Sequence, residues 1–135
     1  MNDWNAKVID EFRANKGKVG GQFDGAPILL LGTTGAKTGA ERVHPVVYLL
    51  ENGTLYVFAS KAGAPRHPDW YLNLVAHPQV TVELGPETFP ATARVVTGPE
   101  RDRLYARQSE AMPGFAEYQE KTSRVIPVVA LDRAA

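Results

Sequence analysis

The chain has 135 residues, of which 44% are hydrophobic and 22% are charged, and its formal net charge is zero. This length predicts a single domain over residues 1–135, and the balanced charge argues against a nucleic-acid binder, which needs excess Lys and Arg. The lack of cysteine excludes disulfides and thiolate metal sites, fits the cytoplasm, and means that redox chemistry would need a bound cofactor. No apolar run reaches the length of a membrane span, and residues 1–18 do not resemble a signal peptide.

The first predicted element is a short amphipathic helix over about residues 3–17. Apolar residues recur every four positions along it, and Gly17 ends it. The recurring residues are Trp4, Val8 and Phe12. We expect this face to pack on the body of the protein, with weak contact to a membrane surface as the alternative. A glycine-rich connector follows over residues 20–25.

The rest of the chain alternates short β-type runs with turns, and it ends in helices and one last strand. Glu51-Asn52-Gly53 is a strong hairpin signal, and Pro90 predicts an edge strand or a bulge. The predicted strands cover residues 28–31, 42–50, 54–59, 79–84, 88–96 and 126–131; the predicted helices cover residues 67–76, 98–111 and 115–121. This pattern predicts a mainly β fold with peripheral helices (α+β), an antiparallel barrel with its helices outside.

The most informative segment is the loop over residues 32–42, which contains three glycines, three threonines, Lys37 and Arg42. Glycines allow close approach to a ligand, and a lysine with an arginine suits a phosphate. The loop is not a P-loop, because Ala36 precedes Lys37. The alternative is an ordinary hairpin loop with solvated cations.

A second loop, residues 59–66, has the same small and cationic character and leads into His67-Pro68-Asp69-Trp70-Tyr71. Trp70 and Tyr71 offer an aromatic wall for a flat ring. Because adjacent residues on a helix lie about 100° apart, we expect one of the two to pack in the core instead. We interpret His67 as a helix cap beside Pro68.

Other chemistry is less evident in the sequence. The three histidines lack metal-ligand spacing, so we expect no metal site, and no serine lies in a nucleophile elbow. Apolar and aromatic residues cluster around Pro113-Gly114, where they form either a helix packed on the barrel or a lid over an apolar substrate. These residues are Tyr105, Met112, Phe115 and Tyr118.

Four ordered motifs resemble the deazaflavin-dependent nitroreductase family of actinobacteria, which uses coenzyme F420. The motifs cover residues 31–45, 59–65, 67–74 and 124–129. The resemblance implies a split β-barrel like that of FMN-binding proteins. It also implies a reductase that passes a hydride from the reduced deazaflavin to an electron-poor small molecule: a quinone, a coumarin-type unsaturated lactone or a nitroaromatic compound.

The resemblance also implies roles for individual residues. Lys37, Thr38 and Arg42 match positions at the phosphate and tail, and Pro45 and Val47 match positions along the ring. The ring-facing segment matches Phe58, Ala59, Ser60, Lys61, Ala62 and Gly63, and Trp70 would lie against the site. Met112, Phe115 and Tyr118 match the substrate side. Ser60 and Tyr118 are the candidate catalytic residues, and the proton for the product comes from Ser60, from Tyr118 or from water.

Two departures from the family pattern affect these implications. Ala36 stands where members often have arginine, and Met112 and Phe115 stand where nitroreductases have tyrosines. Coenzyme binding is therefore expected, whereas nitroimidazole reduction is in question. The alternatives are an FMN-binding oxidoreductase on the same barrel and a non-catalytic deazaflavin-binding module. Split barrels often form homodimers, which we expect by analogy of fold.

Overall fold

The computed structural model describes residues 3–15 and 27–133, except for the side chains of residues 3–5 and of Ala62. The predicted connector over residues 20–25 and the side-chain contacts expected of Trp4 and Ala62 therefore lie outside the described residues. No helix in the described part of the chain is long and apolar enough to cross a membrane.

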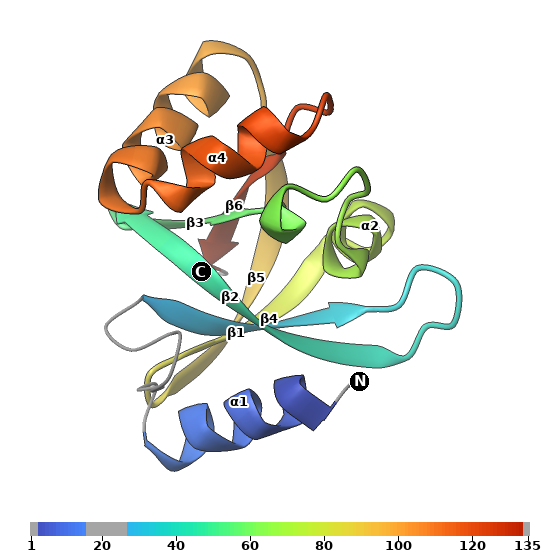
Figure 1. The fold of residues 1–135 in the computed structure, drawn as a ribbon. Coiled ribbons are helices and arrows are strands. Elements are labelled where there is room, and N and C mark those ends of the chain that lie inside the picture. Colours follow the sequence, from blue (N-terminus) through green and yellow to red (C-terminus); the bar gives the residue numbers. More distant parts are fainter. Residues whose placement is uncertain (1–2, 16–26, 134–135) are drawn as a thin grey trace.

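Six antiparallel strands close into a barrel in the order β1-β2-β3-β6-β5-β4 (Figure 1). The strands are β1 Ile28–Thr34, β2 Glu41–Glu51, β3 Thr54–Phe58, β4 Gln79–Leu84, β5 Glu87–Val96 and β6 Val128–Arg133. The pairs β1–β2, β2–β3 and β4–β5 are hairpins, β5 pairs with β6 across the connection that holds the last two helices, β1 closes on β4, and β3 pairs with β6. The predicted antiparallel barrel with outer helices is therefore confirmed.

Turn chemistry and alternation explain the best-predicted strands. Asn52 and Gly53 have φ angles of 51° and 82°, the left-handed pair that a type I′ hairpin between β2 and β3 requires. Along β4, Val80 and Val82 are buried and Thr81 is exposed, as period-two alternation predicts.

The barrel interior is filled by alternate residues of the strands, and α2 (Asp69–Ala76) closes it from one side. Trp70 and Leu74 of α2 belong to this cluster, at 6% and 2% exposed. The strand residues in the cluster are Leu29, Leu31, Leu55, Val57, Val80, Val82, Phe89, Ala91, Val129 and Leu131. Because α2 is anchored through the core, its outward face is held at a fixed place over β1.

The remaining helices cover the outside of the barrel. Helices α3 (Gly98–Ala111) and α4 (Gly114–Lys121) pack over β3 and β6, above the barrel in Figure 1. Helix α1 (Asp3–Ala14) packs against β1 through an apolar face made of Val8, Ile9 and Phe12. Since that face is occupied by the barrel, the structure gives no support to the membrane contact considered above.

Several element boundaries differ from the predictions. The strand predicted over residues 28–31 continues to Thr34, and the last strand begins at Val128 and not at residue 126. The prediction that Pro90 marks an edge strand or a bulge is wrong, because β5 lies between β4 and β6 and its register with β4 continues unbroken through Pro90. Pro90 pairs with Thr81 of β4, and the β6 ladder begins one residue later at Ala91, so its missing N–H is not needed. A short 3-10 turn, η2 (Lys61–Gly63), was not predicted.

Candidate functional site

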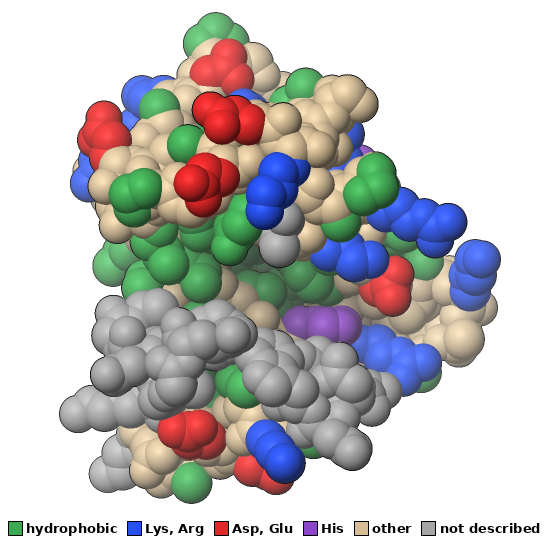
Figure 2. All heavy atoms as spheres, in the orientation of Figure 1, with side chains coloured by type: hydrophobic (Ala, Val, Ile, Leu, Met, Phe, Trp, Pro, Cys, Tyr) green, Lys and Arg blue, Asp and Glu red, His purple; other side chains and the backbone are tan. Residues whose placement is uncertain are grey.

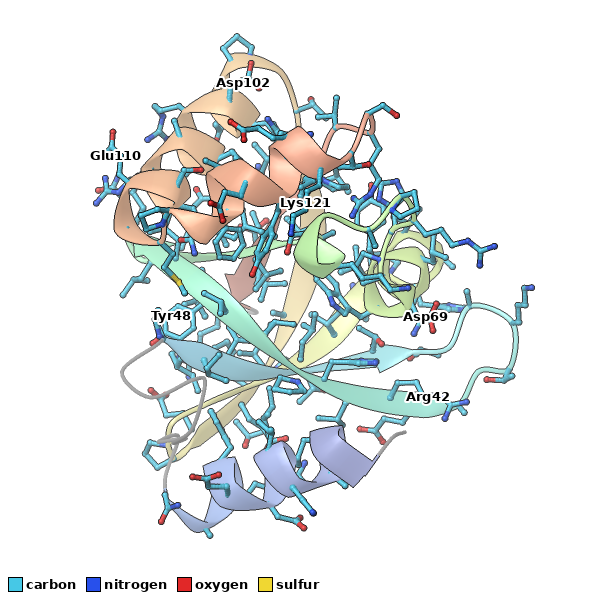
Figure 3. All side chains as sticks on the ribbon, viewed as in Figure 1. Arg42, Tyr48, Asp69, Asp102, Glu110 and Lys121 are labelled. Carbon is cyan, nitrogen blue, oxygen red and sulfur yellow. The ribbon has the colours of Figure 1, made fainter. Side chains whose placement is uncertain are left out.

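A pocket of about 590 Å³ opens between the loop joining β1 to β2 and the outward face of α2. In Figure 3, Arg42 and Asp69 mark its two sides. The residues lining it are Gly35, Ala36, Lys37 and Thr38 of the loop, Arg42, Val43 and His44 of β2, and Asp69, Leu72 and Asn73 of α2. The first glycine-rich loop therefore forms one wall of a pocket, and the binding of an anion by its cations stays a prediction.

The loop closes on itself through its own backbone. The Gly35 N–H donates to the Ala40 carbonyl at 2.7 Å, and the Gly39 N–H donates to the Gly35 carbonyl at 2.9 Å. The Ala40 N–H donates to the Thr38 hydroxyl at 3.2 Å. A Cβ on Gly35 would lie 2.7 Å from that hydroxyl oxygen, so a larger residue there would displace the Thr38 side chain.

Asn73 ties this loop to helix α2. Its Oδ1 accepts the Ala36 N–H at 3.0 Å, and its Nδ2 donates to the Thr33 hydroxyl at 3.1 Å. Both Asn73 and Thr33 are buried. The amide therefore fixes the distance between the two walls of the pocket.

The pocket carries an excess of positive charge. Lys37 and Arg42 form no ion pair among the described residues, and Asp69 supplies the one carboxylate of the lining. Burial lowers the pKa of His44 below its usual 6.5, more than the negative charge of Asp69 raises it. The wall thus presents two cations, one carboxylate and a neutral imidazole.

His44 has one unsatisfied atom. Its Nδ1 is buried and has no hydrogen-bond partner in the described part of the chain. A buried polar atom without a partner is costly, and such an atom in a pocket wall points to a bound group that completes it.

The second predicted loop packs against α4 through η2. Lys61 and Gly63 have φ angles of 46° and 81°, in the left-handed region. A Cβ on Gly63 would lie 2.8 Å from the Tyr118 carbonyl oxygen, which shows how closely η2 and α4 approach each other. Ser60, at the start of the turn, is 8% exposed.

An apolar wall runs from β2 to helices α3 and α4. Its half-buried members are Val47, Leu49, Met112 and Tyr118. In Figure 2, apolar side chains line a hollow directly below α3 and α4, while Lys and Arg side chains gather on the right-hand side of the molecule.

The aromatic residues behind this wall form a packed cluster and do not form a loose lid. The Phe115 ring contacts Phe58, Tyr105 and Tyr118 edge-on, with centroid distances of 5.7, 6.4 and 5.3 Å. The Tyr105 hydroxyl donates to the Phe115 carbonyl at 2.6 Å, and burial raises the pKa of Tyr105 to about 12. Phe115 is buried, so Tyr118 and Met112 are the cluster members that reach the surface of the wall.

The structure brings together only part of the predicted cofactor set. Lys37, Thr38 and Arg42 line the pocket. Of the other predicted residues that the structure describes, these do not line it: Pro45, Val47, Phe58, Ala59, Ser60, Lys61, Gly63 and Trp70. Trp70 is buried in the barrel core, as we expected for one of the two adjacent aromatics, while Tyr71 is half-buried against His67 with ring centroids 4.8 Å apart.

The interpretation of His67 as a helix cap is wrong. Pro68 occupies the cap position of α2, and no side chain caps that end. The Nδ1 atom of His67 lies 3.0 Å from Nη1 of Arg124 instead.

Sequence reasoning gave no role to three residues of the pocket: His44, Asp69 and Asn73. Asp69 and Asn73 are four residues apart on one helix, so they share a face, and that spacing is readable from the sequence. The position of His44 depends on the pairing of β2 with β1, opposite Leu31, and carries no local pattern.

Comparison with known proteins places the chain in a family. The model of the F420H(2)-dependent quinone reductase family matches residues 4–133. The chain belongs to this family. An F420H(2)-dependent quinone reductase of Mycobacterium tuberculosis (strain ATCC 25618 / H37Rv) is 41% identical over 126 residues, which cover 90% of this chain and 85% of the relative.

Two solved structures share the barrel and much of the sequence. An F420-H2 dependent reductase (FDR-A) is 46% identical, with a TM-score of 0.72, and the match covers 78% of this chain and 94% of that one. A domain-swapped dimer is 41% identical, with a TM-score of 0.74, and the match covers 96% and 98% of the two chains. The split β-barrel expected from the motifs is confirmed.

Family membership makes the chain an oxidoreductase with coenzyme F420 as its cofactor. The residues of the pocket fit the phosphate-bearing part of that cofactor. Lys37 and Arg42 provide charge that no carboxylate in the described ion pairs neutralises, and the buried Nδ1 of His44 lacks a partner. This donor set suits an anion.

Proposed function

We propose that the chain is an F420H2-dependent quinone reductase, a single catalytic domain that also accepts other electron-poor, flat-ringed molecules such as coumarins and nitroaromatics. The observation that carries this proposal is that one strand, β2, contributes to two surfaces. It supplies Arg42 to the cationic pocket and Val47 and Leu49 to the apolar wall that includes Met112 and Tyr118. A phosphate-bearing cofactor and an apolar ring acceptor need those two surfaces side by side.

Lys37, Thr38 and Arg42 would hold the phosphate and tail of the coenzyme. Lysine supplies a point charge, arginine a planar fork with parallel N–H groups, and the Thr38 hydroxyl still has its own proton to donate. The neutral His44 would complete this set, since its buried Nδ1 needs a partner.

The ring would lie along β2 at Pro45 and Val47, with the turn at Ser60–Gly63 on its other side. When bound in its reduced form, coenzyme F420 supplies a hydride to the acceptor. The residues here then have to bind, orient and exclude water, which agrees with a site that has no acid–base pair among its lining residues beyond Asp69 and His44.

Ser60 and Tyr118 are the proposed sources of a proton for the product. Tyr118 is half-exposed at the apolar wall, and its hydroxyl forms no hydrogen bond with the described residues, so it is free to meet an acceptor. Met112 would contact the acceptor directly from the same side. The buried Phe115 would act indirectly, by supporting the Tyr118 ring.

A fluorescence titration of the purified protein with coenzyme F420, and separately with FMN, tests the cofactor. We expect coenzyme F420 to bind and FMN to bind weakly or not at all. Lys37→Ala should weaken coenzyme binding about tenfold to hundredfold, because a charge-assisted contact is lost. Lys7→Ala, an exposed lysine on α1, is the matched control and should bind as the wild type does.

Turnover of a water-soluble quinone with reduced coenzyme, followed by the absorbance of the oxidised coenzyme, tests the reaction. We expect quinone reduction, with a coumarin and a nitroimidazole as further acceptors to be compared at equal concentration. Binding of coenzyme without turnover of any of the three would contradict the proposal and favour a non-catalytic deazaflavin-binding module.

We also propose a homodimer. One observation supports it: a solved relative that matches nearly the whole chain is a domain-swapped dimer. Sedimentation equilibrium at micromolar concentration tests it, and a mass of one 14.7 kDa chain would contradict it.

A further inference from the structure

The turn from Ser60 to Gly63 has an unusual backbone. Two of its four residues are left-handed, and one of them is Lys61, at φ 46°. Residues with a side chain seldom adopt this conformation, and they keep it when the surrounding structure holds them there. The backbone supports the turn through three hydrogen bonds: the Gly63 N–H donates to the Ser60 carbonyl at 2.9 Å, the Ala64 N–H to the Lys61 carbonyl at 3.0 Å, and the Ser60 N–H to the Phe58 carbonyl at 2.9 Å.

Arg124 supplies the outer support, from a distance of about 60 residues along the sequence. Its Nη1 donates to the Ala59 carbonyl at 2.9 Å, its Nη2 to the Ser60 carbonyl at 2.6 Å, and its Nε to the Ala64 carbonyl at 2.9 Å. A further contact joins Nη1 to His67 Nδ1 at 3.0 Å. One guanidinium group therefore forms hydrogen bonds to the backbone on both sides of the turn.

The position of Arg124 is itself fixed by a second polar network. Gln119 of α4 donates to the Arg124 carbonyl at 2.7 Å and accepts the Ile126 N–H at 3.0 Å. Arg101 of α3 donates to the same Gln119 oxygen at 2.7 Å and to the Ile126 carbonyl at 2.8 Å. The turn is thus tied, through Arg124, to the two helices that carry the apolar wall.

The partners of Arg124 are not those of an ordinary surface arginine. Arg94, for comparison, pairs with the carboxylate of Asp132 at 2.9 Å. Arg124 has three carbonyls and a histidine, and no carboxylate lies within ion-pair distance among the described residues. Burial lowers the pKa of Arg124. The pKa of His67 is lowered by burial and by the positive charge of Arg124, so the neutral His67 ring accepts the hydrogen bond from Arg124.

We propose that Arg124 is the positioning residue of the coenzyme site, which holds the Ser60–Gly63 turn in the shape that receives the coenzyme ring. This proposal rests on the proposed function, which places that turn against the ring. Arg124 acts through the turn and need not touch the coenzyme. A preformed turn lowers the ordering cost of binding, so loss of the clamp weakens binding while the barrel stays folded.

The test compares Arg124→Ala, Arg124→Lys and the control Arg94→Ala. Lysine keeps the charge but has no planar fork, so it cannot bracket three carbonyls at once. In the absence of ligand, hydrogen exchange of the amides in residues 59–68 should be faster in both Arg124 variants and unchanged in the control. The dissociation constant for coenzyme F420 should rise about tenfold in Arg124→Ala and be partly restored by millimolar guanidinium ion.

Unchanged hydrogen exchange in the turn, or wild-type coenzyme binding in both Arg124 variants, would overturn the proposal. If Arg124→Ala fails to fold, Arg124→Lys carries the same two measurements. Wild-type protein that binds no coenzyme would instead overturn the proposed function. The exchange measurement without ligand would then still decide whether Arg124 holds the turn.

Discussion

Replacing Asn73 by alanine is the sharpest test of how the pocket is held together. The change removes two hydrogen bonds, at 3.0 and 3.1 Å, that link α2 to Ala36 and to Thr33. Ala36 is exposed, so its N–H can form a hydrogen bond with water instead. Thr33 is only 2% exposed, so its hydroxyl oxygen loses the Asn73 donor without replacement by water. Each bond contributes about 0.5–1.5 kcal/mol, so we expect a loss of about 2 kcal/mol of unfolding free energy.

This loss converts into a measurable melting shift. At about 2.1 cal/mol/K per residue, the unfolding entropy of a chain of this length is about 0.28 kcal/mol/K, so about 2 kcal/mol lowers Tm by about 7 °C. Gln79→Ala is the matched control, since its amide makes one exposed contact of 3.4 Å with Thr92 and should cost less than about 0.5 kcal/mol.

A double-mutant cycle separates the bond to Thr33 from the rest. Thr33→Val removes the acceptor of the Asn73 amide, so the two changes should be less than additive by about 1 kcal/mol. Urea unfolding of the four proteins measures this coupling. Additive effects, or an Asn73→Ala protein as stable as the Gln79→Ala control, would refute the role assigned to Asn73.

Two further predictions concern backbone space and pH. Gly63→Ala should lower the free energy of unfolding by about 2–4 kcal/mol, because its Cβ would lie 2.8 Å from the Tyr118 carbonyl oxygen. Gly53→Ala is the control: Gly53 has nearly the same φ but nothing within 4 Å, so the loss should be about 1 kcal/mol. Urea unfolding measures both, and equal losses would contradict this prediction. Burial lowers the pKa of both His44 and His67 in the folded protein. Below about pH 6.5 the unfolded chain therefore binds more protons than the folded one, and the free energy of unfolding falls as the pH falls. This pH dependence should be shallower in the double variant His44→Gln/His67→Gln.

The elements that the sequence predicted well are those with local causes. The Asn52-Gly53 turn and the alternation of β4 depend on neighbours a few residues away. The end of β1 was missed because Gly32 was assigned to the loop. In the barrel Gly32 pairs with Thr81 of β4, where a Cβ would sit 3.4 Å from the threonine side chain, so a small residue continues the strand.

The missed features have long-range causes. Ile126 looks like a strand residue, but its N–H is taken by the Gln119 side chain, and the strand begins two residues later. The left-handed Lys61 has no local signature, since its support comes from Arg124. The predicted roles of Ser60, Lys61 and the other ring-facing residues stay predictions until the titrations above are done.

The closure of the barrel has a consequence for self-association. Each of the six described strands has a neighbour on both sides, because β1 pairs with β4 as well as with β2. This closure limits the free strand edge that could support edge-to-edge aggregation. One stretch of strand still has a single neighbour, because residues 41–47 of β2 pair with β1 and not with β3. Another copy that added a strand would meet that edge, whereas the exchange of a paired element must first break backbone hydrogen bonds and should be slow.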